Sequence, residues 1–185
     1  MDSLRGKLLL ASPAMGDPNF ERAVILLVQH GDEGALGLVL NRPTDTSLAE
    51  AMASLPGVEC GIDGPLHRGG PCDGPLMALH RDTVGGEERV MDGVCWSTQR
   101  EYVEPVLAGA AGPAVFFAGY AGWGAGQLEG ELQADAWVVT DTDGDTVLTP
   151  GEGEGWWLGL IRRQRRDTLG QRFDPKIVPP DPSMN

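Results

Sequence analysis

A glycine-rich segment is the pattern in this sequence that most resembles a ligand-binding loop. Residues 119–126 read GYAGWGAG and lead into a helix expected over 127–133. Glycines let a backbone approach a ligand closely, and the free N–H groups of a helix N-terminus attract anions. The spacing matches neither the Walker A pattern nor the full dinucleotide-binding pattern, and no lysine follows it directly. We interpret the segment as a tight strand–helix turn, and any pocket beside it would be rimmed by Tyr120, Trp123 and Gln127.

Asn41 and Arg42 are a second candidate, at the end of an apolar run over residues 35–40. The planar five-donor guanidinium of arginine suits a carboxylate or phosphate. Asparagine and the following proline are also ordinary turn residues, and Arg42 can pair with an acid such as Asp17 or Glu21. Turn chemistry alone explains this composition, so we expect a structural role and keep ligand binding as the alternative.

Asn19 and Arg22 belong to the polar segment that precedes an apolar run over residues 23–29. The side chain of Asp17 or of Asn19 can bond to the backbone of a turn. Glu21 and Arg22 place an acid beside a base, but neighbouring residues of a strand point to opposite faces of a sheet. This geometry argues against an acid–base pair that acts on one substrate atom.

Side chains that could bind a metal follow no metal-binding pattern. The spacings between His67, Cys72 and His80 fit no structural zinc motif, and nothing nearby orients a cysteine and a histidine as a nucleophile–base pair. His30 is expected in a hairpin turn. We therefore expect no metal, no cofactor and no catalytic residue. The odd number of cysteines, three, indicates reduced, buried thiols.

The segment Asp141–Asp145 resembles the start of a calcium-binding loop, with Glu152 at the twelfth position. Such a loop needs glycine where this chain has Thr146, and it follows a helix, whereas this segment follows an expected strand. We interpret it as an acidic hairpin turn.

Positive charge is concentrated late in the last expected helix, at Arg162, Arg163, Arg165 and Arg166. The cluster could dock an acidic partner, an RNA or a membrane surface, but no aromatic residues interleave the arginines as in single-strand binding platforms. Basic residues near a helix C-terminus complement the helix dipole, and the helix can lie against an acidic body. We expect this structural role.

The elements that must position these residues alternate between strands and helices without a regular strand–helix–strand repeat. Strands are expected over residues 8–11, 23–29, 35–40, 76–80, 89–91, 114–120 and 136–140. The second and third form a hairpin around a five-residue turn, while residues 57–74, dense in Gly and Pro, should be irregular. This order favours an α+β fold over a doubly wound parallel sheet.

Three capping-box spacings predict where helices begin. The pairs are Ser47 with Glu50, Thr98 with Glu101, and Thr149 with Glu152. Pro105 should kink or shorten the second helix, and Trp157 and Ile161 should share one face of the last.

Length and charge bound the class of protein. The 185 residues suit a single domain, expected over residues 1–173, followed by a Pro-rich tail over 174–185. The net charge of −13 argues against direct nucleic-acid binding. Neither a secretory signal nor a membrane span is recognisable, so we expect a cytoplasmic protein that does not enter membranes.

Three segments carry a family pattern in a fixed order. They are LLLASPAMGDPNFERAVILLVQHGDEGALGLVLNRP over residues 8–43, the Gly69-Gly70-Pro71 turn, and YAGWGAGQLEGELQADAW over residues 120–137. Together they resemble the YqgE/AlgH family of bacterial proteins, although the last residues of the chain depart from the family pattern. The resemblance implies a mixed, largely antiparallel sheet curled into a pseudo-barrel with helices packed outside, in a cytosolic protein without a settled activity.

The leading hypothesis is a non-enzymatic binding or regulatory module for an unknown small molecule or protein partner. Polar and Gly-rich segments at strand ends commonly present function. The candidate surface therefore comprises Asn19, Arg22, Asn41, Arg42, Gly69, Gly70, Tyr120, Trp123 and Gln127. The alternatives are a transcriptional regulator that acts through a protein partner, a label that some family members carry, and an unrecognised hydrolase or transferase.

Overall fold

The fold is built on one long strand shared by two parts of an open sheet. The computed structural model describes residues 2–53, 59–82 and 85–172. Within them the strands are β1 (Leu8–Ala11), β2 (Val24–Gly31), β3 (Gly34–Val39), β4 (Pro43–Ser47), β5 (Pro65–Arg68), β6 (Cys72–Arg81), β7 (Glu88–Met91), β8 (Val94–Ser97), β9 (Ala114–Gly124) and β10 (Trp137–Thr140). The helices are α1 (Leu48–Met52), α2 (Arg100–Leu107), α3 (Gln127–Gln133), α4 (Gly144–Leu148) and α5 (Gly153–Arg172).

The main path of the sheet runs β10-β1-β2-β3-β9-β6-β8-β7, with antiparallel neighbours throughout. β9 pairs with β6 over residues 114–120 and with β3 over residues 121–124. β5 lies parallel to β9 and antiparallel to β4. Because β10 and β7 end the path without meeting, the sheet is curled but not closed. The α+β class and the largely antiparallel sheet are confirmed.

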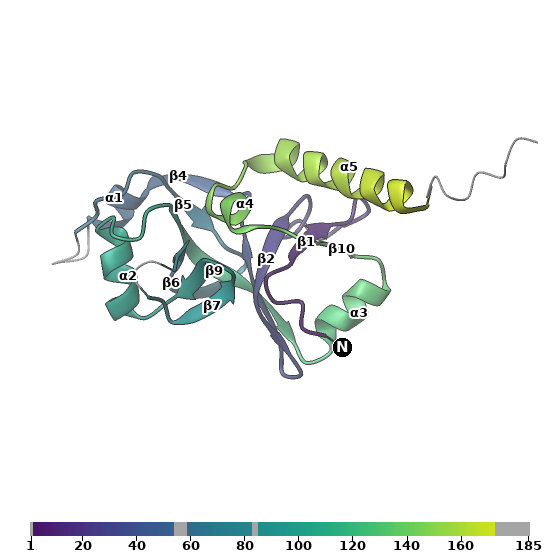
Figure 1. Ribbon diagram of the computed structural model, residues 1–185, viewed down its shortest axis with the longest axis horizontal. Helices are drawn as coiled ribbons and strands as arrows, with labels where there is room; N and C mark the ends of the chain where they lie inside the picture. Colours follow the sequence, from purple (N-terminus) through teal and green to yellow (C-terminus); the bar gives the residue numbers. More distant parts are fainter. Residues whose placement is uncertain (1, 54–58, 83–84, 173–185) are drawn as a thin grey trace, which may run out of the picture.

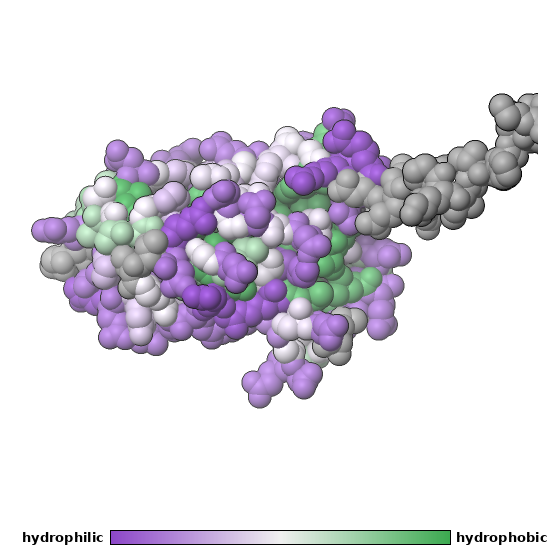
Figure 2. Space-filling model, viewed as in Figure 1, coloured by the Kyte–Doolittle hydropathy of each residue, from purple (hydrophilic) through white to green (hydrophobic). Residues whose placement is uncertain are grey.

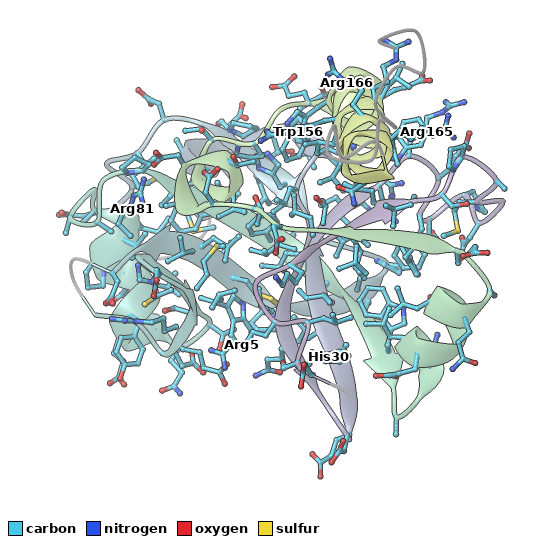
Figure 3. All side chains as sticks on the ribbon, turned by 45° about the vertical axis from the view of Figure 1, so that its right-hand side comes forward. Arg5, His30, Arg81, Trp156, Arg165 and Arg166 are labelled. Carbon is cyan, nitrogen blue, oxygen red and sulfur yellow. The ribbon has the colours of Figure 1, made fainter. Side chains whose placement is uncertain are left out.

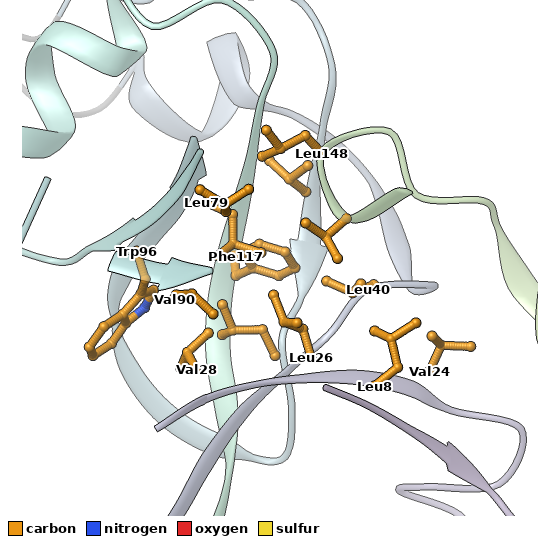
Figure 4. Packing of buried hydrophobic residues seen from close by; sticks show 14 of the residues in the cluster. Leu8, Val24, Leu26, Val28, Leu40, Leu79, Val90, Trp96, Phe117 and Leu148 are labelled. Atoms are coloured by element: carbon orange, nitrogen blue, oxygen red, sulfur yellow. The ribbon is translucent and has the colours of Figure 1, made fainter. Parts of the chain in front are cut away.

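The curl of the sheet is set by an apolar cluster between its two parts (Figure 4). Leu8, Leu26 and Val28 from β1 and β2 meet Leu79 and Phe117 from β6 and β9, although these strands lie far apart along the path. Alternate residues of a strand face opposite sides, so the other faces of the same strands need their own cover.

The helices supply that cover (Figure 1). Leu128 of α3 packs on the cluster that contains Ile25 and Leu27, while α1 and α2 pack on the cluster around Phe116. α5 lies across the remaining side and adds Trp157 to the central cluster. Among the described helices, none combines the length and hydropathy that crossing a bilayer requires.

Two expectations about loops are wrong. The β2–β3 hairpin pairs Gly31 with Gly34, so its loop is Asp32 and Glu33 rather than five residues. Within the segment expected to be irregular, β5 occupies residues 65–68 and β6 begins at residue 72. β5 is held by pairing with distant β9, and such tertiary pairing can override weak local strand preference.

Only the first of the three expected capping boxes is present. Ser47 Oγ accepts the N–H of Glu50 at 3.2 Å, and the Glu50 carboxylate accepts the N–H of Ser47 at 2.9 Å. α2 has no side-chain cap, and Thr98 is not its N-cap residue. The Glu87 carboxylate accepts the N–H groups of Thr98 and Gln99, the two residues before the helix, at 2.8 and 2.9 Å.

The third box fails because an extra helix precedes it. Asp143 caps α4 by accepting the N–H of Thr146 at 2.8 Å, and α5 begins only at Gly153. The expected acidic hairpin turn over residues 141–145 is therefore wrong, since its last two residues lie in a helix that packs Val147 and Leu148 into the core.

The arginine cluster does not occupy the place expected of it. α5 continues to Arg172, so Arg166 lies more than one turn before the end of the helix. A helix dipole acts on charges within the last turn only, so dipole compensation does not explain these arginines. The Pro-rich tail expected over 174–185 lies outside the described residues.

Candidate functional site

Asn41 fixes the end of a strand instead of presenting a polar group outward. Its side chain is buried, Oδ1 accepts the N–H of Val24 at 2.9 Å, and Nδ2 donates to the carbonyls of Arg22 at 2.9 Å and Gly153 at 3.0 Å. The N–H of Gly153 donates back to the Asn41 carbonyl at 3.0 Å. Asn41 therefore ties the start of β2 and the start of α5 to one point, which favours its structural role.

Arg42 braces the turn that contains Asn19. Its guanidinium donates to the carbonyl oxygens of Asn19 at 2.6 Å and Glu21 at 3.2 Å. Burial lowers the pKa of Arg42, adjacent Arg68 lowers it further, and the charges of Asp17 and Glu21 oppose the shift. The expected contact with this acidic turn thus exists, but through backbone carbonyls.

Arg22 lies in the same turn, with a left-handed φ of 56°. Its guanidinium is 3.1 Å from the Glu21 carboxylate and 3.3 Å from that of Glu154. The expectation that Glu21 and Arg22 face opposite ways is wrong, because both precede β2, which begins at Val24. All three side chains are about half exposed, so these ion pairs contribute little stability.

Gly69 and Gly70 let two backbone segments touch. A Cβ atom at Gly69 would lie 2.2 Å from the carbonyl oxygen of Gly119, and one at Gly70 would lie 2.1 Å from the carbonyl carbon of Tyr120. No side chain fits at either position without displacing β9. These two glycines serve the fold.

Trp123 and Gln127 meet at Glu131, whose role the sequence did not reveal. Trp123 is 5% exposed, and its indole stacks on Phe20 with ring centroids 6.1 Å apart. The indole N–H groups of Trp123 and Trp137 donate to the same Glu131 oxygen at 2.9 and 2.7 Å, and Gln127 donates to the other oxygen at 2.9 Å. The carboxylate is therefore fully engaged in joining α3 to the sheet.

Tyr120 lines an open groove of about 480 Å³ between the β2–β3 hairpin and β9. Leu36, Cys72 and Trp123 contribute further to its wall. A Cβ atom at Gly122 would lie 3.2 Å from the Tyr120 ring and 3.9 Å from the Cys72 sulfur. The missing side chain at this position keeps the groove open. We call this feature the Tyr120 groove.

A serine–histidine pair lies elsewhere, on β6 and β8, and sequence reasoning missed it. His80 Nε2 is 3.0 Å from Ser97 Oγ, while Nδ1 donates to the Arg81 carbonyl at 2.9 Å. This is the arrangement of a base and a nucleophile. Both residues are 0% exposed, however, so no substrate atom reaches the hydroxyl in this conformation. Ser97 instead accepts the N–H of Glu87 at 3.1 Å and helps to hold the loop before β7.

The remaining histidines and cysteines are dispersed. His30 lies in β2, one residue before its end, rather than in the turn. It accepts the N–H of Leu4 at 3.1 Å and contacts Glu129 at 3.1 Å. Among the described residues no three His, Cys, Asp or Glu side chains gather as a metal site. All three cysteines are free thiols, but only Cys95 is buried, so the expectation of burial is wrong for Cys60 and Cys72.

Comparison with known proteins places this geometry in a family. A family model described as AlgH-like matches residues 8–168. The chain belongs to the AlgH-like family. It is 40% identical to a UPF0301 protein of Streptomyces coelicolor over 100% of this chain and 97% of the relative, and 37% identical to one of Chlorobaculum tepidum over 97% and 95%.

Two solved structures agree with the fold. The solution structure of the Pseudomonas aeruginosa AlgH protein matches with a TM-score of 0.70 at 28% identity, over 100% of this chain and 97% of that one. A crystal structure of a Corynebacterium diphtheriae protein matches with a TM-score of 0.70 at 22% identity, over 88% and 87%, which is a likeness of fold. The sequence resemblance to the family is thus confirmed.

In this AlgH-like chain the predicted surface divides into three places. Asn19, Arg22, Asn41 and Arg42 form one hydrogen-bonded group around the turn before β2. Gly69 and Gly70 pack against β9. Tyr120 and Trp123 line the Tyr120 groove, while Gln127 contacts Glu131 on α3. Of these three places, the Tyr120 groove is the concave one that could hold a ligand.

Proposed function

We propose that this AlgH-like protein is a non-enzymatic binding module that takes a small, largely apolar molecule into the Tyr120 groove. The observation that carries the proposal is the groove itself, about 480 Å³ and lined by aromatic and aliphatic side chains with polar Gln29 and Glu33 among them. Pockets for small molecules have this size and combine an apolar wall with few polar groups. The Tyr120 ring offers a face for stacking, and its hydroxyl offers a hydrogen bond.

The chemistry around the groove supports binding without turnover. Cys72 is the thiol in the wall, and no histidine lines the groove beside it to act as a base. The His80–Ser97 pair belongs to a separate, fully buried cluster. Cys60 and Cys72 are free thiols with partial exposure, which suits a reducing compartment, so we place the protein in the cytoplasm.

The test is a metabolite screen by thermal shift, followed by variants of the groove. Gly122→Leu should fill the groove and Tyr120→Ala should remove its aromatic wall, so both should abolish the shift produced by a true ligand. Tyr102→Ala changes the other tyrosine of the chain, on α2, and should bind as the unchanged protein does. A ligand that still binds Gly122→Leu with equal affinity would remove the groove from consideration.

Alkylation of Cys72 gives a second readout. In a Cys60→Ser background the remaining thiols are Cys72, in the groove, and Cys95, which is buried. Bound ligand should slow alkylation of Cys72 by iodoacetamide. An unchanged rate at saturating ligand would place the ligand elsewhere.

A further inference from the structure

The arginines of α5 make no ion pair with a described carboxylate, although the charge of Arg163 helps to lower the pKa of Asp143. Arg162, Arg163, Arg165 and Arg166 are all exposed, and they supply four of the chain's 14 basic residues. None of them forms an ion pair with a carboxylate whose side chain the structure describes. Figure 3 shows Arg165 and Arg166 projecting from α5 away from the sheet. A compact block of positive charge is thus available on a strongly acidic protein.

A cleft lies directly beside this block. Its volume is about 530 Å³, and Leu160 and Arg163 of α5 face Leu8 and Thr140 of the sheet across it, with Lys7 at its side. Figure 2 shows hydrophilic surface on the outer side of α5 and apolar surface below the helix. The wall of the cleft therefore holds two cations and two acids, Asp141 and Asp143, beside an apolar floor.

The wall of the cleft contains a polar group without a partner. Thr142 Oγ1 is buried and makes no hydrogen bond among the described residues. Because solvent does not reach this oxygen, it offers no hydrogen bond to a docking segment, and the charges and apolar side chains of the cleft carry the argument. The acids of the wall are already engaged: Asp141 pairs with Lys7, and Asp143 caps α4.

We propose that α5 and this cleft dock a short acidic segment of a partner protein. Arginine binds carboxylates in forked pairs, and complementary charge steers such encounters. The apolar floor would receive an aliphatic side chain of the segment. The proposal concerns a surface separate from the Tyr120 groove and does not depend on ligand binding there.

The shape of the charged block favours a peptide over a nucleic acid or a membrane. Five consecutive helical residues span only about 6 Å along the axis. A nucleic acid carries charge along its whole length, so its flanks would meet the acidic remainder of a chain whose net charge is −13. Trp157 and Ile161 turn the apolar face of α5 into the core, and within residues 153–166 no apolar side chain is fully exposed for insertion into lipid.

The test uses a fluorescent oligoglutamate peptide and measures its anisotropy with the full chain at low ionic strength. Replacing Arg162, Arg163 and Arg166 together by Gln should weaken binding roughly tenfold. Arg100→Gln is the matched control, because Arg100 is an exposed helical arginine paired with Glu104 outside this surface. Absence of binding, equal losses in both variants, or no loss in the triple variant would overturn the proposal.

Two further experiments test whether the peptide binds at the cleft or is held by charge attraction alone. In chemical-shift mapping, the peptide should perturb amides of residues 140–142 and 160–166, and shifts centred on Arg42 and Arg68 would overturn the assignment. An RNA oligonucleotide and anionic vesicles of matched charge should bind more weakly than the peptide. If the RNA or the vesicles bound more tightly than the peptide, the proposal of an acidic protein segment would be wrong and that probe would indicate the class of partner.

Discussion

Single polar residues with several partners organise this protein at the scale of the residue. Asn41 joins β2 to α5, and Glu131 joins two tryptophans to α3. Both side chains have every polar atom engaged, and a ligand would have to break those bonds to use them. The sequence predicted Asn41 as a candidate because it is a polar residue at the end of a strand. The sequence could not predict whether the hydrogen-bond partners of Asn41 lie inside the molecule or in a ligand.

Glu87 gives the clearest dependence on pH. Burial raises the pKa of its carboxyl group, but hydrogen bonds from Thr98 and Gln99 outweigh burial and hold it below the ordinary value of 4.5. A depressed folded pKa stabilises the protein above the unfolded pKa, and this stability is lost as pH falls through the folded pKa. Glu87→Gln should therefore lower the free energy of unfolding at neutral pH by about 0.5 kcal/mol, because solvent screens a carboxylate this exposed.

The measurement is urea unfolding of both proteins over a pH series that runs from neutral to acid. The difference between them should shrink as the pH falls below 4.5. Glu101→Gln, which changes an acid of the first turn of α2, is the control for charge alone. A difference independent of pH would exclude the carboxylate cap as the cause.

At the scale of the element, one buried tryptophan helps to fix α5. Trp157 is 6% exposed, and its indole N–H donates to the Ala11 carbonyl on β1 at 2.8 Å. Trp157→Phe keeps an aromatic ring but leaves that carbonyl unpaired, so it should cost about 2 kcal/mol of the free energy of unfolding. Trp156→Phe, at a half-buried neighbour on the same helix, should cost less, and chemical denaturation compares the two. Equal losses would show that the hydrogen bond contributes nothing.

Elements with a strong local signal could be predicted from the sequence, and those made by distant pairing could not. The apolar runs gave β1, β2 and β3, and α3 was predicted at its observed bounds. β5 exists because β9 lies beside it, and the two residues before α2 are held by Glu87 from the loop before β7. The candidate site followed the same rule: Tyr120 and Trp123 were predicted as rim residues, but Cys72 joins them only through the pairing of β6 with β9.

On the scale of the whole molecule, β9 should make unfolding cooperative. Phe116 faces the cluster under α1 and α2, while its neighbour Phe117 faces the central cluster. Loss of this strand would therefore open both clusters together. Urea unfolding followed by far-UV circular dichroism and by tryptophan fluorescence should give coincident transitions. Separate midpoints would show that the two parts of the sheet unfold independently.

The open sheet also has a colloidal consequence. Its two terminal strands, β10 and β7, each have one strand neighbour on the main path, and such edges are templates for pairing between molecules. The large negative charge keeps copies apart in neutral solution, but that repulsion vanishes near the isoelectric point of about 4.5 and is screened by salt. Mild acid should therefore bring the edges of separate molecules together and turn a clear solution cloudy before the chain itself unfolds.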